Sequence, residues 1–346
     1  LSLDAQLNQI GPDEAWGIDN FAWSFAQPIS VNLHDFTSFD GDKSISEIER
    51  IVFADGEIII SSDGTSIITN DQANVVDVGA ADGPLYVFGN GGDDQFNISL
   101  AVTSIDGGEG ADSLAFVSPK TNLVLDLTSG IGHLSSDQGQ SQFTVANVER
   151  IVGTVNDDSI SGGDGDDVLK GGDGWDWLYG NGGNDFLRGG AGADELRGGS
   201  GDDVLHVDGA DMVLDGGEGM DTLYVEGPAG VTIGPGAGIE IAFGNVGDDV
   251  FDGSDLTVAA EFSGGAGADQ LTGGSGWDRL TGGSGDDVID GGVGDDVIAG
   301  GIGDDLIVGG DDNDRVTGDA GDDDILGGSG DDVIDGGVGD DGIAGG

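Results

Sequence analysis

The sequence predicts an all-β solenoid of short stacked strands, and three observations predict it. A nine-residue period runs through much of the C-terminal half of the 346-residue chain. Each period opens with glycine and aspartate, the residues that form tight turns with positive φ. Each period then places one large apolar residue at the centre of a three-residue strand, which sends it to one face. One unit cannot bury that face, whereas stacked units form a continuous core.

The period is most regular in two blocks. The units of the second block, residues 264–344, are GGAGADQLT, GGSGWDRLT, GGSGDDVID, GGVGDDVIA, GGIGDDLIV, GGDDNDRVT, GDAGDDDIL, GGSGDDVID and GGVGDDGIA. The units of the first block, residues 153–224, are GTVNDDSIS, GGDGDDVLK, GGDGWDWLY, GNGGNDFLR, GGAGADELR, GGSGDDVLH, the degenerate VDGADMVLD and GGEGMDTLY. We expect the core to contain their central apolar residues: Leu169, Leu178, Leu187, Leu196, Leu205, Leu271, Leu280, Ile289, Ile298, Ile307, Val316, Ile325, Ile334 and Ile343.

Composition narrows the partners to cations. The chain has 72 glycines, 68 Asp plus Glu against 9 Lys plus Arg, and a formal net charge of -59. Such a charge repels nucleic acid and anionic membrane surfaces. With no cysteine and only three isolated histidines, the available ligands are carboxylate and carbonyl oxygens, which favour a hard cation such as calcium. No run of 18 apolar residues exists, so we expect no membrane span.

The repeats resemble the G-G-x-G-x-D-x-U-x nonapeptide of the RTX family of secreted bacterial proteins, where U is a large apolar residue. Looser copies are GNGGDDQFN at 89–97 and GGEGADSLA at 107–115. The resemblance implies a right-handed parallel β-roll, in which two nonapeptides form one coil with calcium in the turns on both flanks. It also implies an extracellular or cell-surface protein exported by type I secretion.

The resemblance further implies a metal-ligand set, the aspartates at position 6 of each unit. These are Asp158, Asp167, Asp176, Asp185, Asp194, Asp203, Asp221, Asp269, Asp278, Asp287, Asp296, Asp305, Asp314, Asp323, Asp332 and Asp341. With one ion between each unit and the next but one, roughly 13 calcium ions are expected, about a dozen. Weaker binding is expected where Met212 occupies position 6 and where Asp312 and Asp319 replace glycines. The position-5 aspartates are interpreted as solvated charge: Asp166, Asp202, Asp286, Asp295, Asp304, Asp322, Asp331 and Asp340.

Five segments are predicted. They are an N-terminal cap or adapter at 1–56, an irregular β-solenoid with degenerate repeats at 57–152, the first roll block at 153–224, a longer-rung insert at 225–263 and the second roll block at 264–346. Residues 116–161 and 225–263 are interpreted as two versions of one insert, the alternative being unrelated loops.

The predicted function is a calcium-binding protein with a structural or surface role, of the S-layer, adhesin or filament type, that folds on calcium after secretion. No residue constellation indicates catalysis, so we do not expect an enzyme. The alternative is the C-terminal folding and export module of a secreted enzyme or toxin whose catalytic domain is absent. Ice binding needs rows of Thr and Asn, and only GTVND at 153–157 fits.

Outward positions suggest self-association. Alternate units share a sheet, so one outer face of the second block presents Val288, Leu306, Val308 and Leu326, either as a contact surface or as scattered aliphatic side chains. A roll that stops at GIAGG leaves strand edges unpaired, which would also allow end-to-end stacking. Trp175, Trp177 and Tyr179 either pack locally or offer a sugar-stacking surface.

Overall fold

The computed structural model describes a chain of strands and turns. The described residues are 30–32, 51–53 and 56–60, as backbone only, and 66–78, 85–98, 102–117, 121–136 and 139–346. They contain no helix, so the predicted all-β fold is confirmed, and none of them belongs to a helix that would cross a membrane. Most of the predicted cap at 1–56 lies outside the described residues. The chain divides into two compact units, residues 1–154 and 155–346, which are described separately below.

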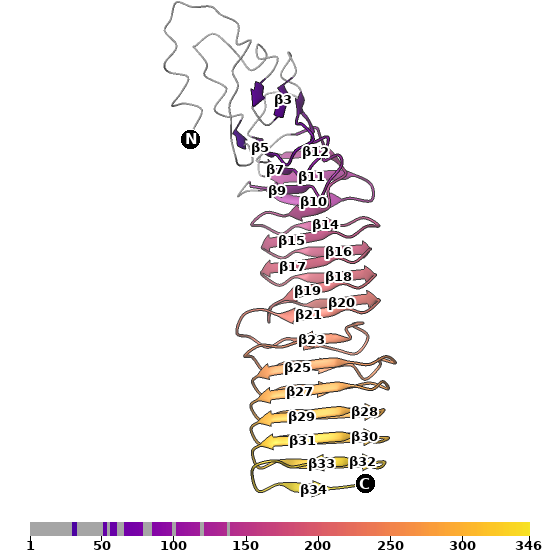
Figure 1. Cartoon of the computed structure of the whole chain (residues 1–346). Helices are drawn as coiled ribbons and strands as arrows, with labels where there is room; N and C mark the ends of the chain where they lie inside the picture. The colour runs from indigo at the N-terminus through magenta and orange to yellow at the C-terminus, as the bar shows by residue number, and fades with distance from the viewer. Residues whose placement is uncertain are drawn as a thin grey trace, which may run out of the picture. The chain divides into compact units, whose positions relative to one another are not determined.

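The second unit is a stack of coils in which each strand pairs in parallel with the strand one coil further on (Figure 1). Leu169 lies opposite Leu187, and Leu187 lies opposite Leu205, so one coil takes 18 residues. Two nonapeptides therefore form one coil, and the predicted parallel β-roll is confirmed. Many strands are six residues long, because the glycines that open the next unit continue the strand before the chain turns.

Three parallel sheets run along this unit. The first sheet consists of β15 (Val168–Asp173), β17 (Phe186–Ala191), β19 (Val204–Val207), β21 (Thr222–Val225), β23 (Ile241–Phe243), β25 (Glu261–Ala266), β27 (Arg279–Ser284), β29 (Val297–Ile302), β31 (Arg315–Ala320) and β33 (Val333–Asp335). The second consists of β14 (Ser159–Ser161), β16 (Trp177–Gly182), β18 (Glu195–Ser200) and β20 (Val213–Glu218). The third consists of β22 (Thr232–Ile233), β24 (Val250–Asp252), β26 (Gln270–Thr272), β28 (Val288–Val293), β30 (Leu306–Asp311), β32 (Asp324–Ser329) and β34 (Gly342–Ala344).

The core is the row of central apolar residues predicted from the period. From Leu169 to Ile325 these side chains are at most 3% exposed. Ile334 is only half-buried and Ile343 is 51% exposed, because they lie on the last coil and no further coil covers them. Burial of one apolar side chain per unit contributes about 1.5 to 3 kcal/mol, so the stack of units supplies most of the stabilisation.

Residues 225–263 lengthen the coil by one or two residues and keep its parallel pairing. Ile241 lies opposite Thr222, 19 residues before it, and Glu261 lies opposite Ile241, 20 residues before it. The second sheet ends at β20 on this side of the roll, and the third sheet begins with β22.

The first unit contains shorter parallel coils and one antiparallel insertion. Its parallel strands are β1 (Ser30–Asn32), β5 (Val75–Val78), β7 (Gln95–Ile98), β9 (Ser113–Phe116) and β13 (Arg150–Val152) in one sheet, and β4 (Ser66–Ile68), β6 (Tyr86–Phe88) and β8 (Ser104–Asp106) in another. The antiparallel strands are β2 (Ile51–Phe53) with β3 (Gly56–Ile60), and β10 (Asn122–Asp126), β11 (Ile131–Ser136) and β12 (Gly139–Ala146).

The interpretation of 116–161 and 225–263 as versions of one insert is wrong. Between β9 and β13 the chain folds back twice, through the turn at residues 127–130 and again between β11 and β12, so it forms an antiparallel meander. The 225–263 segment instead continues the parallel winding. The five predicted segment boundaries remain predictions.

Candidate metal centre

The turns of the second unit have one recurring backbone conformation. In the unit that begins at Gly171, positions 2 and 4 are Gly172 at φ 124° and Gly174 at φ 128°. This left-handed region favours glycine, and among other residues Asn and Asp tolerate it best. Asn181, Asp312 and Asp319 occupy glycine positions with φ of 75°, 80° and 73°. The substitutions at 312 and 319 therefore preserve the turn, and weaker calcium binding there stays a prediction.

The position-6 aspartates form columns along the flanks of the roll. The Oδ1 atom of each accepts a hydrogen bond from the backbone N–H of the residue one coil earlier: Asp278 N–H donates to Asp296 at 2.8 Å, and Asp296 N–H donates to Asp314 at 2.9 Å. The aspartates of the predicted ligand set lie in four runs: Asp158, Asp176 and Asp194; Asp167, Asp185, Asp203 and Asp221; Asp269, Asp287, Asp305, Asp323 and Asp341; and Asp278, Asp296, Asp314 and Asp332.

The second carboxylate oxygen of most of these aspartates has no hydrogen-bond partner. Those whose Oδ2 is buried and unpartnered are Asp176, Asp185, Asp194, Asp203, Asp221, Asp269, Asp287, Asp296, Asp305, Asp314, Asp323 and Asp332. A buried carboxylate oxygen without a partner is costly, since neither water nor a donor replaces its hydration. Two members differ: Asp167 Oδ2 accepts the N–H of Gly163 at 2.6 Å, and Asp278 Oδ2 accepts that of Gly274 at 2.7 Å.

The unpartnered oxygen faces a pocket that exists because position 1 is glycine. A Cβ added to Gly282 would overlap with Asp287 Oδ2 and would lie 2.6 Å from the carbonyl oxygen of Gly300, one coil on. The same pair of oxygens, one carboxylate and one carbonyl, surrounds the equivalent glycines along both flanks, for example Gly180, Gly198, Gly273, Gly309 and Gly318. Each pocket therefore gathers electron-rich oxygens from two successive coils and holds no donor for them.

Burial raises the pKa of these carboxyl groups. It raises the pKa of Asp176 to about 8 and those of Asp185 and Asp296 to about 7, and the neighbouring aspartates of the column raise them further. The backbone N–H that each Oδ1 accepts acts in the opposite direction. A cation in the pocket would stabilise the ionised form and remove this penalty.

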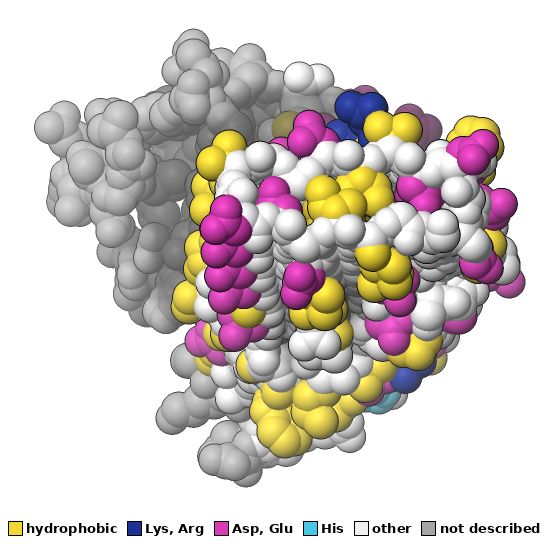
Figure 2. Space-filling model, turned by 90° about the horizontal axis from the view of Figure 1, so that it is seen from below, with side chains coloured by type: hydrophobic (Ala, Val, Ile, Leu, Met, Phe, Trp, Pro, Cys, Tyr) yellow, Lys and Arg dark blue, Asp and Glu magenta, His cyan; other side chains and the backbone are white. Residues whose placement is uncertain are grey.

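The oxygens fit calcium. Among residues 66–346 with described side chains, no three Asp, Glu, His or Cys side chains converge on one point, so a metal must take main-chain ligands as well. Calcium accepts six to eight oxygens in flexible geometry, including backbone carbonyls, whereas zinc requires nitrogen or sulfur. The carboxylate and carbonyl oxygens of the position-1 pockets are of this kind. In Figure 2, acidic side chains follow one another in a row along an edge of the roll.

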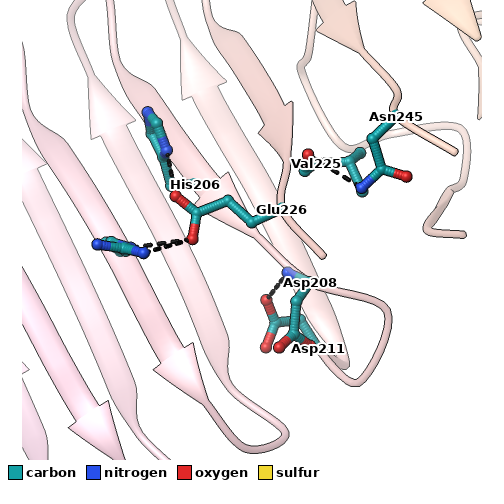
Figure 3. Close-up of polar contacts among 7 residues, drawn as sticks. His206, Asp208, Asp211, Val225, Glu226 and Asn245 are labelled. Carbon is teal, nitrogen blue, oxygen red and sulfur yellow. Dashed lines mark hydrogen bonds and ion pairs between the residues drawn. The ribbon is translucent and has the colours of Figure 1, made fainter. Parts of the chain in front are cut away.

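Three acidic residues join the columns although the period does not select them. Asp194 N–H donates to Asp211 at 3.0 Å, so Asp211 fills the place where the period puts Met212, and Met212 is 68% exposed. Asp211 also accepts the N–H of Asp208 at 2.8 Å (Figure 3). Asp221 N–H donates to Glu240 at 2.9 Å.

Asp249, the third of these residues, carried a signal that the search for position 6 missed. It is position 6 of GNVGDDVFD at 244–252, and it accepts the N–H of Val231 at 2.7 Å. For Asp211 the sequence gives no sign beyond an acid one place early.

The position-5 aspartates are more than solvated charge. They are mostly exposed, yet Asp286 Oδ1 accepts the N–H of Asp304 at 3.0 Å, and Asp304 Oδ1 accepts that of Asp322 at 2.9 Å. Asp166, Asp202 and Asp295 make the equivalent bond. The donor here belongs to the later coil, so this outer row runs opposite in direction to the buried one. Position 5 therefore contributes to the joint between coils.

Comparison with known proteins agrees with the geometry. The family model of the RTX calcium-binding nonapeptide repeat matches residues 152–187, 179–211, 188–223, 261–289, 290–325 and 317–346. The matches leave out residues 224–260, where the coil is longer than 18 residues. The comparison with curated proteins finds no match to the chain.

Proposed function

Over residues 152–223 and 261–346 the chain belongs to the RTX calcium-binding repeat family, and from this premise we propose an extracellular β-roll with a structural or surface role that folds on binding calcium. The repeats bind calcium, and the roll is of the kind found in secreted proteins. The observation that supports the coupling of folding to calcium is the row of buried, unpartnered Asp Oδ2 atoms.

The position-6 aspartates are the proposed ligands, together with the carbonyl oxygens of the position-1 glycines, for about a dozen ions. Without metal, aspartates of one column follow each other at the strand spacing of about 5 Å. Their repulsion costs about 1 to 3 kcal/mol per pair at dielectric values between those of water and protein. A marginally stable fold does not absorb a dozen such terms, so ion binding and folding become one event.

The proposed site of action is outside the cell. Extracellular calcium sites have dissociation constants of about 0.1 to 1 mM, above the free calcium of the cytosol. A chain with such sites stays unfolded during synthesis and folds after export, which suits the type I route. The described acidic side chains are engaged in the columns, so we assign them to metal binding and not to acid–base catalysis.

The proposed structural role rests on the outer faces of the roll. On the third sheet, Val288, Leu306 and Leu326 are 45%, 50% and 45% exposed, and Val308 lies beside Leu326. On the first sheet, Arg279 and Arg315 lie two coils apart, in a chain with few basic residues. Apolar side chains flanked by Asp290 and Asp324 on the third sheet complement the arginine-bearing face, so we propose that the two faces of neighbouring copies pack together.

One experiment tests the proposal at both levels. Circular dichroism during a calcium titration, with magnesium as control, should show β-structure forming cooperatively with calcium. Light scattering on the same samples should then show assembly, which L306N/L326N abolishes and V258N, a change at an exposed loop valine, leaves intact. A chain equally folded in EGTA would overturn the calcium coupling. A chain that folds with calcium but stays monomeric at high concentration would favour the export-module alternative.

A further inference from the structure

Two turns of the first unit have the conformation of the roll turns although the family model does not match them. They are residues 89–94 (GNGGDD) and 107–112 (GGEGAD), in front of β7 and β9. Positions 2 and 4 of the first turn are Asn90 and Gly92, with φ of 63° and 92°, and those of the second are Gly108 and Gly110, with φ of 103° and 147°. The backbone therefore exposes its carbonyl groups in the same manner as in the second unit.

The same carboxylate column continues through these turns. Asn74 N–H donates to Asp94 Oδ1 at 2.7 Å, and Asp94 N–H donates to Asp112 Oδ1 at 2.7 Å. Both aspartates are buried, at 1% and 0% exposure. The column ends at Glu149, which accepts the N–H of Asp112 at 2.9 Å.

An oxygen-lined pocket lies beside each aspartate. A Cβ on Gly107 would lie 2.5 Å from Asp112 Oδ2 and would overlap with the carbonyl oxygen of Asn147. A Cβ on Gly89 would lie 2.5 Å from Asp94 Oδ2 and would overlap with the carbonyl oxygen of Gly107. Side-chain and main-chain oxygens of successive coils thus meet at the places left open by two glycines.

The oxygens of these pockets lack donors. Asp112 Oδ2 is buried and has no hydrogen-bond partner. Asp94 Oδ2 has only the Thr69 hydroxyl, at 3.5 Å. Carboxylate and carbonyl oxygens that face one another in a buried pocket require a cation between them, and this mixture of ligands is the one that calcium accepts.

We propose that the first unit contains a calcium site of its own at these turns, with Asp94 Oδ2, Asp112 Oδ2 and the carbonyl oxygens of Gly107 and Asn147 as protein ligands. The choice of calcium rests on the proposed function, whereas the location rests on the contacts above. Asn147 directly follows β12, and its Nδ2 donates to Asp106 at 2.7 Å. The ion therefore ties the end of the antiparallel insertion to the parallel coils, and calcium controls the first unit as well as the repeats.

Hydrogen exchange with mass spectrometry on the full chain tests the site locally. In wild-type protein, calcium and not magnesium should slow exchange in peptides from residues 85–117 as well as from 282–301. In D112N an amide NH₂ takes the place of Oδ2, so the calcium concentration that protects 85–117 should rise roughly 10- to 100-fold, while that for 282–301 stays the same. D71N makes the same change at an exposed position of this unit and should have no effect.

The outcomes separate this inference from the proposed function. If 282–301 responds to calcium and 85–117 exchanges equally in calcium and in EGTA, the site in the first unit is refuted and the function of the repeats stands. If neither region responds, the proposed function itself fails. Should D112N not fold, the wild-type comparison of the two regions still decides.

Discussion

Filling a position-1 pocket with a single methyl group should disable one joint of the roll. In G180A the new Cβ would overlap with Asp185 Oδ2 and lie 2.5 Å from the carbonyl oxygen of Gly198. Gly180 does not have a left-handed φ, so alanine suits its backbone and the effect comes from the pocket alone. The Asp185 side chain has to move away.

The expected loss has two parts. When Asp185 moves, the buried N–H of Asp167 loses its acceptor at 2.8 Å, which costs about 1 to 3 kcal/mol. The ion is also excluded, and at about 10 mM calcium with a dissociation constant of about 0.1 to 1 mM its binding stabilises the fold by about 1.4 to 2.7 kcal/mol. Alanine returns about 0.4 to 1 kcal/mol through the unfolded state. The net free energy of unfolding should fall by about 1.5 to 5 kcal/mol.

Urea unfolding followed by circular dichroism at fixed free calcium measures this difference. The midpoint for G180A should fall by about 0.5 to 2 M urea. The matched control is G165A, because a Cβ on Gly165 meets nothing within 4 Å and its φ is not left-handed. If G180A and G165A unfold at the same urea concentration and need the same calcium, the pocket is not an ion site and the reasoning fails.

Two further changes probe the columns. In D211A the N–H groups of Asp194 and Asp208 lose their acceptor, so the free energy of unfolding should fall by about 1 to 3 kcal/mol, whereas M212A at the exposed neighbour should change it by less than about 0.5 kcal/mol; equal effects in urea unfolding would return the ladder position to residue 212. In EGTA, stability should be greatest near pH 4 and should be lost as the pH rises through about 7 to 8, because burial raises the folded-state pKa of Asp176 to about 8 and those of Asp185, Asp221, Asp287 and Asp296 to about 7; circular dichroism across this range should show it, and a metal-free chain that gains structure on the alkaline side would contradict the sign.

The sequence predicts the regular part of this fold almost completely, since the period is itself the structural repeat. A fixed spacing of nine residues places Leu169, Leu187 and Leu205 in one row and their turns in another, with no freedom in register. The antiparallel meander at β10–β12 was not predictable in this way, because it belongs to no repeat and its pairing is decided by two local turns.

The candidate site divides along the same line. The period selects Asp296 and its equivalents, and the structure places them in columns. It does not select Asp211, whose carboxylate reaches the column because the chain at Asp208 turns one residue early. Nor does it indicate that Asp167 and Asp278 have both oxygens occupied by backbone N–H groups, since that depends on turn dihedral angles that glycine leaves open.

The direction of the buried ladder gives assembly of the roll a preferred order. Each acceptor carboxylate belongs to the coil that follows its donor amide, as with Asp278 N–H and Asp296. A nucleus at the C-terminal end therefore offers every incoming coil a finished template, and zipping proceeds toward the N-terminus. In the reverse direction, each newly laid coil would wait with an amide unanswered until its successor arrived.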